Sequence, residues 1–182
     1  MSRLTPPVGP RDHVQGNPDA PIQLVEYGDF ECPFCGRAYL VVKALQQALG
    51  DALCFVFRNF PVGTMHPHAV RAAQAAEAAA LQDSFWQMHD MLFENQSDLE
   101  DEDLVEYAAE IGLDLPRFQR DIDSPEVAAK VRADFLSGAR SGVNGTPTFF
   151  VNGERYDGSW EADVFLARLR ALLDAPPELP FD

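Results

Sequence analysis

The feature that most constrains the fold is a pair of cysteines at the junction between a predicted strand and a predicted helix. Residues 22–27 form a short apolar-rich run that is typical of a strand, and Cys32 and Cys35 follow it closely. Residues 33–49 have apolar side chains along one side of a helix. A second apolar strand is predicted at residues 53–60. A strand, a helix and a strand in this order predict a β-α-β unit. A right-handed crossover through the helix would make the two strands parallel.

The middle of the chain, residues 67–140, has a helical pattern. The alanine-rich stretch at 69–80 has high helix propensity, and the pattern runs on through residues 85–93. Ser97 and Glu100 have the spacing of a capping box, which predicts the start of a further helix there.

The last part of the chain combines short helices with a hairpin. Pro116 and Pro125 stand where helices can begin. Residues 148–151 and 154–156 flank an Asn-Gly pair, which is the strongest short signal for a hairpin between two strands. A final helix is predicted at residues 161–173.

These elements predict one α/β domain in which a helical insertion separates a βαβ half from a ββα half. A chain of 182 residues suits one domain with a sizeable insertion, and 46% hydrophobic residues suffice for a core without disulfide or metal staples. The predicted segments are an extended N-terminal arm (1–20), the βαβ half (21–66), the helical insertion (67–140), the ββα half (141–175) and a C-terminal tail (176–182).

The charge and hydropathy of the chain exclude some partners. A net charge of −15 repels phosphate backbones, so nucleic acid is not an expected partner. No run of about 20 apolar residues predicts a membrane span. The first residues lack an apolar stretch of signal-peptide type, which favours a cytoplasmic location; export is the alternative if a signal peptide has been removed.

The position of the two cysteines favours redox chemistry. Cys32 is predicted as the N-cap of the helix, with Pro33 at the first helical position. Free N–H groups and the positive end of the helix dipole favour a thiolate at Cys32. Cys35 lies three residues on, on the same helical face, and can resolve a mixed disulfide formed by Cys32.

Zinc binding is the alternative for a lone C-x-x-C. A structural zinc site usually needs four Cys or His ligands. Beyond the pair the chain has Cys54 and four histidines, of which His66 and His68 could supply nitrogens. Cys54 alternates with its neighbours on an apolar strand and is predicted to be buried and inert. The strand–C-x-x-C–helix context favours redox chemistry without a metal.

Two motifs together resemble DsbA-like proteins. Residues 26–35, EYGDFECPFC, resemble the active-site region of that family, and residues 142–153, GVNGTPTFFVNG, are similar to its second signature. Further family-like segments lie at residues 58–61, 66–69 and 85–90, so the resemblance covers about residues 13–173. It implies a thioredoxin-like fold with a helical insertion, and thiol–disulfide oxidoreductase activity without a cofactor.

The resemblance also implies roles for individual residues. Thr146 and Pro147 would form a cis-proline element beside the disulfide, and Pro33 and Phe34 would join them in binding substrate. Glu26, six residues before Cys32, would be a buried carboxylate that exchanges protons with Cys35, with a pKa raised toward neutrality. The alternative for Glu26 is a surface acid at the edge of the sheet.

This chain departs from the strong-oxidant members of the family at Phe34, where those proteins carry histidine. Phenylalanine offers no N–H or positive charge to a thiolate at Cys32, so a less oxidising disulfide is expected. Some relatives pair the buried acid with a lysine that has no evident match here; Arg58 is the cation considered for that place.

The sequence leaves the direction of electron flow open. The same residues serve an oxidase, a reductase or an isomerase, and the redox poise of the compartment decides between them. The expected substrates are cysteines of other proteins, approached as extended segments, with a small thiol or a redox protein as recycling partner. A glutaredoxin-like deglutathionylase and a redox-silent zinc- or protein-binding module are the alternative functions.

Overall fold

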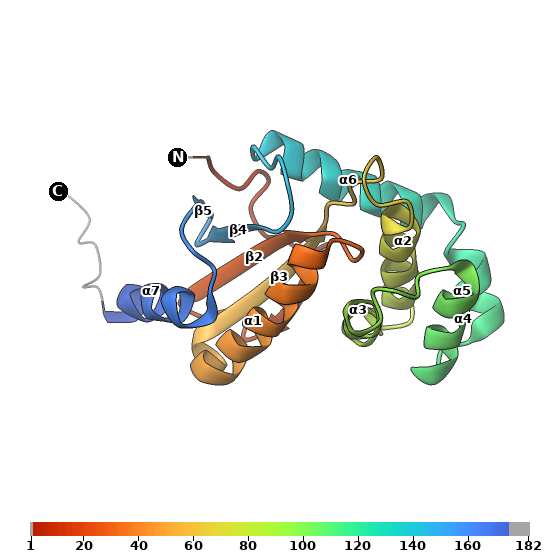
Figure 1. Cartoon of the computed structure of the whole chain (residues 1–182), viewed down its shortest axis with the longest axis horizontal. Coiled ribbons are helices and arrows are strands. Elements are labelled where there is room, and N and C mark those ends of the chain that lie inside the picture. The colour runs from red at the N-terminus through yellow and green to blue at the C-terminus, as the bar shows by residue number, and fades with distance from the viewer. Residues whose placement is uncertain (1, 175–182) are drawn as a thin grey trace.

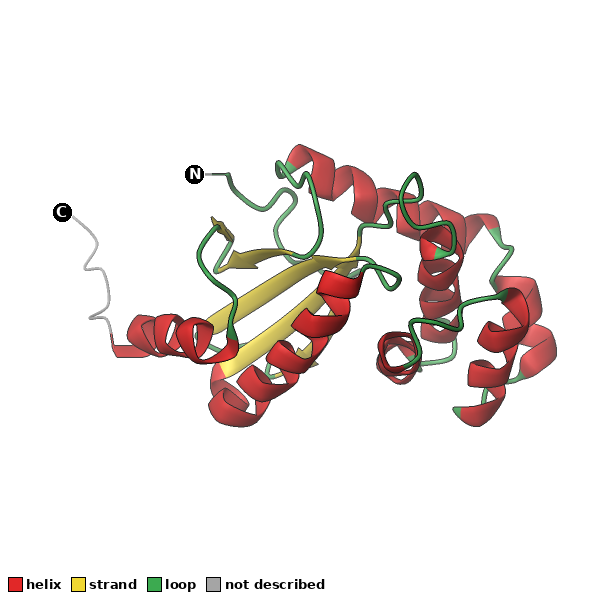
Figure 2. Cartoon of the chain, viewed as in Figure 1, coloured by secondary structure: helices red, strands yellow, loops and turns green. Residues whose placement is uncertain are grey.

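The computed structural model describes residues 2–174 and has a mixed α/β fold. The order of its elements confirms the predicted class, because β2-α1-β3 follows the short strand β1, helices come next, and β4-β5-α7 closes the chain (Figures 1 and 2). The predicted tail, residues 176–182, lies outside the described residues. The elements are β1 (His13–Gly16), β2 (Ile22–Gly28), α1 (Pro33–Leu49), a 3-10 turn (Gly50–Ala52), β3 (Leu53–Asn59), α2 (Ala69–Ala80), α3 (Phe85–Glu94), α4 (Asp101–Glu110), α5 (Leu115–Asp121), α6 (Pro125–Arg140), β4 (Thr148–Val151), β5 (Glu154–Tyr156) and α7 (Ala162–Asp174).

The strands form one sheet in the order β1-β3-β2-β4-β5. β2 and β3 pair in parallel, as the β-α-β prediction requires, and β4 pairs antiparallel with β2. The expected order of elements omitted β1, which pairs antiparallel with β3 at the edge of the sheet. The segment 13–16 carries no alternating apolar pattern, so its pairing depends on the backbone that β3 exposes.

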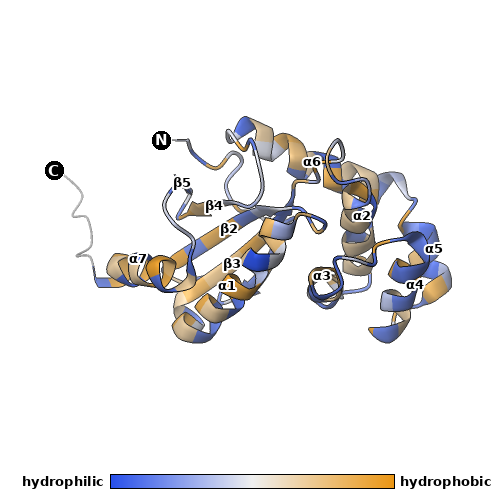
Figure 3. Ribbon diagram, viewed as in Figure 1, coloured by the Kyte–Doolittle hydropathy of each residue, from blue (hydrophilic) through white to orange (hydrophobic). Residues whose placement is uncertain are grey.

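Alternation along the strands gives the sheet two buried faces. Leu24 of β2 packs on the face covered by α1, α3 and α7, whereas Val25 and Tyr27 pack on the opposite face. α6 crosses that opposite face, and Tyr27 bonds to Ser137 of α6 at 2.8 Å between hydroxyl oxygens. Gly138 permits this approach, because a Cβ there would lie 2.6 Å from the ring of Phe60. Hydrophobic residues accordingly concentrate along β2 and β3 (Figure 3).

Helices α2–α5, here called the helical unit, lie beside the sheet, and α6 runs from the helical unit back across it (Figure 1). The prediction of a helix continuing through residue 93 is wrong, because α2 ends at Ala80 and α3 starts at Phe85. Asp83 has a φ of 57°, a left-handed conformation that interrupts a right-handed helix.

The starts of α4 and α6 test two predictions of where helices begin. α4 starts three residues later than Ser97 predicted: Glu100 is its N-cap and forms the capping box with Asp103. The hydroxyl of Ser97 instead donates to the Asp98 carboxylate at 2.8 Å. α6 begins at Pro125, as predicted. No helix within residues 2–174 is long and apolar enough to cross a membrane.

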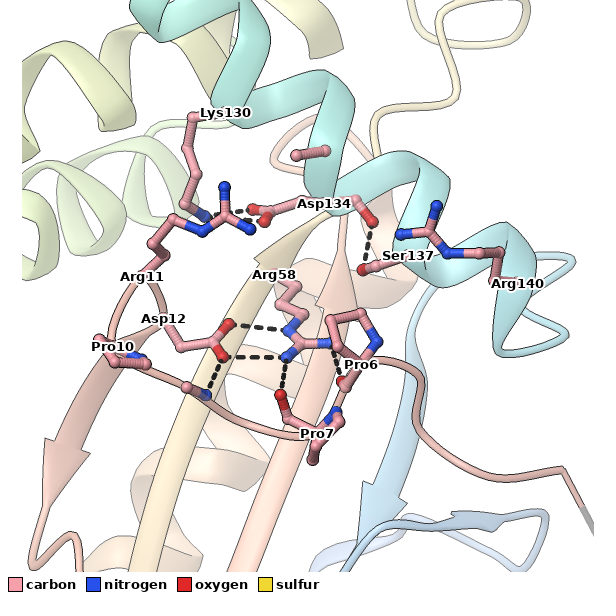
Figure 4. Close-up of a pocket in the computed structure, with 12 residues that line it drawn as sticks. Pro6, Pro7, Pro10, Arg11, Asp12, Arg58, Lys130, Asp134, Ser137 and Arg140 are labelled. Carbon is pink, nitrogen blue, oxygen red and sulfur yellow. Dashed lines mark hydrogen bonds and ion pairs between the residues drawn. The ribbon is translucent and has the colours of Figure 1, made fainter.

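A buried ion pair joins the N-terminal segment to β3. Arg58 is 3% exposed and donates to both carboxylate oxygens of Asp12, at 2.8 and 2.9 Å. Its other N–H groups reach the carbonyls of Pro6 and Pro7 (Figure 4). Arg58 also donates to the hydroxyl of Tyr27 at 2.9 Å. Arg58 therefore fixes the N-terminal segment before β1, which has little secondary structure of its own.

The next residue of β3 holds the helical unit and α6. The Asn59 side chain donates to Glu77 of α2 at 2.7 Å and to Asp134 of α6 at 3.0 Å. The backbone N–H of Asn59 also reaches Asp134, at 3.1 Å, and Lys130 pairs with Asp134 at 2.7 Å. These contacts hold the end of β3, where the chain leaves the sheet, against α2 and α6.

We expect Arg58→Met to lower the free energy of unfolding by about 3 kcal/mol or more. Removing one partner of a buried ion pair leaves the other charge uncompensated, which typically costs about 3–5 kcal/mol. Urea unfolding measures the loss. Arg71→Met is the matched control: Arg71 pairs with Asp101 and Asp123, whose side chains are both 70% exposed, so it should lose less than about 1 kcal/mol. Equal losses in the two variants would contradict the anchoring role of Arg58.

Candidate active site

Cys32 lies at the N-terminus of α1, where the turn after β2 leads into the helix. It is the N-cap residue, with an extended backbone (φ −68°, ψ 121°), and Pro33 follows at the start of the helix. As a thiol it donates from Sγ to the carbonyl of Thr146 at 3.5 Å. A hydrogen bond from Cys35, together with Thr146 and the N–H groups of Cys35 and Phe34, outweighs burial and lowers the pKa of Cys32 to about 5. Cys32 is therefore a thiolate at neutral pH.

Cys35 occupies the opposite kind of environment. It is fully buried, and the N–H of Asp29 points at its Sγ from 3.5 Å. Burial raises the pKa of Cys35 well above its usual range, and the bond to Cys32 and the charges of Glu26 and Cys32 add to this. The pair therefore consists of a thiolate next to a protonated thiol.

Glu26 lies on β2 on the same face as Leu24, the face that α1 covers. It is 2% exposed, and its Oε1 has no hydrogen-bond partner within residues 2–174. Burial, reinforced by the charge of Cys32, raises the pKa of Glu26 to about 8. Arg58 does not reach it, because Arg58 is aligned with Tyr27 on the other face of the sheet and is bound to Asp12.

The second sequence signature lies against Cys32. The peptide bond between Thr146 and Pro147 is cis, as the resemblance implies. The hydroxyl of Thr148 donates to the carbonyl of Gly145 at 2.7 Å and closes the turn that precedes β4. The turn directs the carbonyl of Thr146 toward Cys32, so residues far apart in sequence share one site.

An apolar groove of about 570 Å³ opens beside Cys32. Large apolar side chains stand exposed along it, with Phe34 at 54%, Met65 at 74% and Phe135 at 37%. Exposed apolar patches of this kind mark binding surfaces. The groove is lined by Cys32, Pro33, Phe34, Phe60, Pro61, Val62, Gly63, Thr64, Met65, His66, Phe135, Asn144, Gly145 and Thr146.

Asp29 supports the active-site turn, a role that was not predicted from the sequence. Its buried carboxylate accepts hydrogen bonds from the N–H groups of Glu31 and Val62 and from Nδ1 of His66, each at 2.8 Å. Although burial would lower the pKa of His66, the hydrogen bond to Asp29 raises it. An acid directly after the strand and before the C-x-x-C was the available signal.

Gln96 is a second supporting residue that the sequence did not reveal. It lies in the loop between α3 and α4, and its Nε2 donates to the carbonyls of Phe30 and Cys32 at 2.8 and 2.9 Å. A glutamine in a polar loop carries no signal of such a contact.

Among residues 2–174 the other candidate metal ligands form no metal-binding group with the pair, although His66 lines the groove beside Cys32. Cys54 is buried in the core on the far face of the sheet. His66 bonds to Asp29, whereas His68 bonds to Glu31 and Glu100. Within the described residues, no group of three or more His, Cys, Asp or Glu side chains is placed to hold a metal ion.

Two solved structures have the same fold as this chain. A thioredoxin-like oxidoreductase from Silicibacter pomeroyi superposes with a TM-score of 0.81 and 30% identity, over 92% of this chain and 95% of that chain. BdbD from Bacillus subtilis superposes with a TM-score of 0.81 and 26% identity, over 96% of this chain and 98% of that chain.

The chain matches only one part of each of these curated relatives. The chain is 46% identical over 171 residues to a Na⁺/H⁺ antiporter, NhaA 1 of Mycobacterium sp., and 47% identical over 169 residues to NhaA of Herminiimonas arsenicoxydans. The matches cover 92% of this chain but 28% and 27% of those proteins, so the chain spans little more than a quarter of their length.

A family model settles the classification. The model described as Thioredoxin matches residues 9–174, which include the cysteine pair and the cis-proline turn. Together with the solved structures, this match confirms the thioredoxin-like fold and an oxidoreductase function in general. The chain belongs to the thioredoxin family, and its fold is that of a thioredoxin-like oxidoreductase.

Proposed function

We propose that this chain exchanges dithiols and disulfides with protein substrates through a mixed disulfide at Cys32, which Cys35 resolves. The observation that carries the proposal is the contrast between the two thiols. Cys32 is held as a thiolate at the mouth of a groove, and Cys35 is a fully buried thiol next to it. A stable thiolate at Cys32 favours two steps. It is the nucleophile when Cys32 attacks a disulfide, and it is the better leaving group when a mixed disulfide at Cys32 is broken.

In the oxidising direction, a substrate thiolate attacks Sγ of Cys32 in the Cys32–Cys35 disulfide. The new bond joins the substrate sulfur to Cys32, and Cys35 leaves as a thiolate that takes up a proton. A second substrate thiolate then attacks the substrate sulfur of the mixed disulfide and releases Cys32 as a thiolate. The substrate loses two electrons and becomes a disulfide, and the cysteine pair gains them.

Glu26 exchanges the proton of Cys35 in this scheme. Its carboxyl is buried on the strand beside the pair, and a pKa of about 8 keeps most of it protonated at neutral pH. A buried acid that titrates near the working pH can give a proton to a departing thiolate and take it back in the reverse reaction. Because Arg58 is bound elsewhere, the proton transfer does not depend on a neighbouring cation.

The environment of Cys32 favours the oxidising direction. Stabilising the thiolate of the reduced pair makes its disulfide a stronger oxidant. The absence of histidine at Phe34 predicts a weaker oxidant, but here Cys35, Thr146 and backbone N–H groups supply the stabilisation. We therefore infer net oxidation of substrate dithiols, in a compartment where disulfides persist.

The groove favours extended substrate segments with apolar side chains near the reacting cysteine. Phe34 and Met65 line the groove with Cys32, and Gly145 and Thr146 of the cis-proline turn line it as well. A peptide segment could pack its side chains on the apolar surface while its cysteine reaches Sγ of Cys32.

Equilibration of the pair in glutathione buffers, with thiol trapping and mass detection, tests the redox function. We expect a reduction potential nearer to about −120 mV than to about −270 mV, the values of a strong oxidant and of a thioredoxin-type reductant. Cys35→Ser should accumulate a mixed disulfide with a disulfide-containing protein substrate, because Cys32 attacks the substrate disulfide and no second thiol remains to resolve the product. Trapping of glutathione alone would favour a deglutathionylase, and a pair that never forms a disulfide would remove the enzymatic proposal.

The pH dependence of alkylation tests the thiolate. The iodoacetamide reaction of reduced protein should rise with a midpoint near pH 5, because the pKa of Cys32 is about 5. Cys35→Ala should move the midpoint upward, since the hydrogen bond from Cys35 is the largest cause of the lowered pKa. A wild-type midpoint near that of free cysteine, about 8.5, would contradict the thiolate assignment.

Glu26→Gln should slow resolution of the mixed disulfide and stabilise the protein at alkaline pH. The pKa of Glu26 is raised from 4.5 to about 8 on folding, so the native state holds a proton that the unfolded state loses. Wild-type stability should therefore fall relative to Glu26→Gln between about pH 4.5 and pH 8, then run parallel above that. Glu110→Gln, at an exposed position, is the control. An unchanged resolution rate would remove the proton-transfer role.

A further inference from the structure

The turn that carries Cys32 is held from two sides. On one side, the Asp29 carboxylate ties it to the loop after β3 through the N–H of Val62 and the ring of His66. On the other side, Gln96 reaches in from the helical unit and contacts the turn directly at the backbone of Phe30 and Cys32. The helical unit thus touches the nucleophile's own peptide group.

The contact made by Gln96 is specific in geometry. One amide nitrogen, Nε2, donates to the Phe30 carbonyl at 2.8 Å and to the Cys32 carbonyl at 2.9 Å. The carbonyl of Cys32 also accepts the first helical hydrogen bond of α1, from the N–H of Gly36 at 3.1 Å. The side chain therefore bridges the turn and the first turn of the helix.

Gly36 makes room for this bridge. A Cβ at Gly36 would overlap Oε1 of Gln96 and lie 2.8 Å from its Cδ. Glycine inside a helix costs about 1 kcal/mol relative to alanine, so its place in the first turn of α1 calls for a reason. The close approach of Gln96 supplies one.

The position of the Cys32 backbone matters because the thiolate is stabilised by short-range contacts. The N–H groups of Phe34 and Cys35 and the thiol of Cys35 must all point at one sulfur. Hydrogen bonds weaken steeply when their geometry degrades, so a shift of the turn relative to α1 would loosen all of them together.

We propose that Gln96 is a positioning residue for the nucleophile: its amide fixes the peptide groups of Phe30 and Cys32 against α1, through a gap that Gly36 leaves open. The proposal rests on the dithiol–disulfide exchange proposed above and adds that the helical unit sets the reactivity of Cys32. Gln96 touches neither sulfur nor substrate in this role.

Gln96→Ala should raise the pKa of Cys32 and shift the equilibrium with glutathione toward the disulfide by roughly 3- to 10-fold, as expected for lost hydrogen bonds. Gln96→Glu should have the larger effect, because a carboxylate cannot donate to the two carbonyls and adds negative charge near the thiolate. Gln82→Ala is the matched control. Gln82 also bridges a loop, to the backbone of Asp114 at 2.9 and 3.2 Å, and should leave both quantities unchanged.

Gly36→Ala provides an independent test of the same contact. The new methyl group should displace the Gln96 amide and reproduce the rise in the pKa of Cys32. In the Gln96→Ala background the overlap is absent, so Gly36→Ala should leave the pKa of Cys32 unchanged and increase stability. Additive effects on the pKa in the double variant would overturn the proposal.

Two outcomes separate this proposal from the proposed function. If wild-type protein forms the Cys32–Cys35 disulfide but Gln96→Ala changes only the unfolding free energy, then Gln96 is merely structural and the proposal fails alone. If wild-type protein forms no disulfide, the redox function itself fails. Because Glu26, Cys35 and His66 also lie around Cys32, repeating the Gln96→Ala measurement with Glu26→Gln should give the same shift, and its loss would point to Glu26 instead.

Discussion

Parallel pairing of β2 with β3 is the constraint on which the site depends. A parallel pair needs a crossover, and α1 supplies it, so the helix must begin just beyond the end of β2. The free N–H groups at that helix start then surround the residue in the N-cap position, which is Cys32. Antiparallel pairing of β4 with β2 adds the cis-proline turn on the neighbouring side. The nucleophile is therefore placed by the backbone before any side chain acts on it.

Local groups, rather than net charge, stabilise the thiolate. The chain carries a net charge of −15, so the general field opposes an anion at Cys32, whereas the Glu26 carboxyl near the pair is mostly protonated and adds little to that field. Hydrogen bonds from Cys35 and from the first N–H groups of α1 overcome that field. This explains how the site can keep a thiolate although Phe34 supplies no charge. Cys35 remains protonated because its burial disfavours the thiolate. Among the described residues, the donor that offsets this effect is the N–H of Asp29.

The helical unit does more than enlarge the core. Its loops approach the active-site turn through Gln96, and α6 lends Phe135 to the apolar groove beside Cys32. Asn59 and Asp134 join β3 to α6, which fixes that wall of the groove relative to the sheet. The groove and the active-site turn are thereby coupled to the packing of the helical unit and of α6.

The sequence alone determined the α/β class, the β-α-β unit with its cysteine pair, and the hairpin that closes the chain, because these depend on short-range patterns of apolar residues, caps and turns. It did not predict β1, whose pairing depends on an edge that only the folded sheet offers, or the break at Asp83, which is a local backbone conformation. The roles of Asp29 and Gln96 also came only from tertiary structure. Asp29 accepts from a backbone N–H of another segment and Gln96 donates to backbone carbonyls of another segment, and a backbone donor or acceptor leaves no trace in the residue type that carries it.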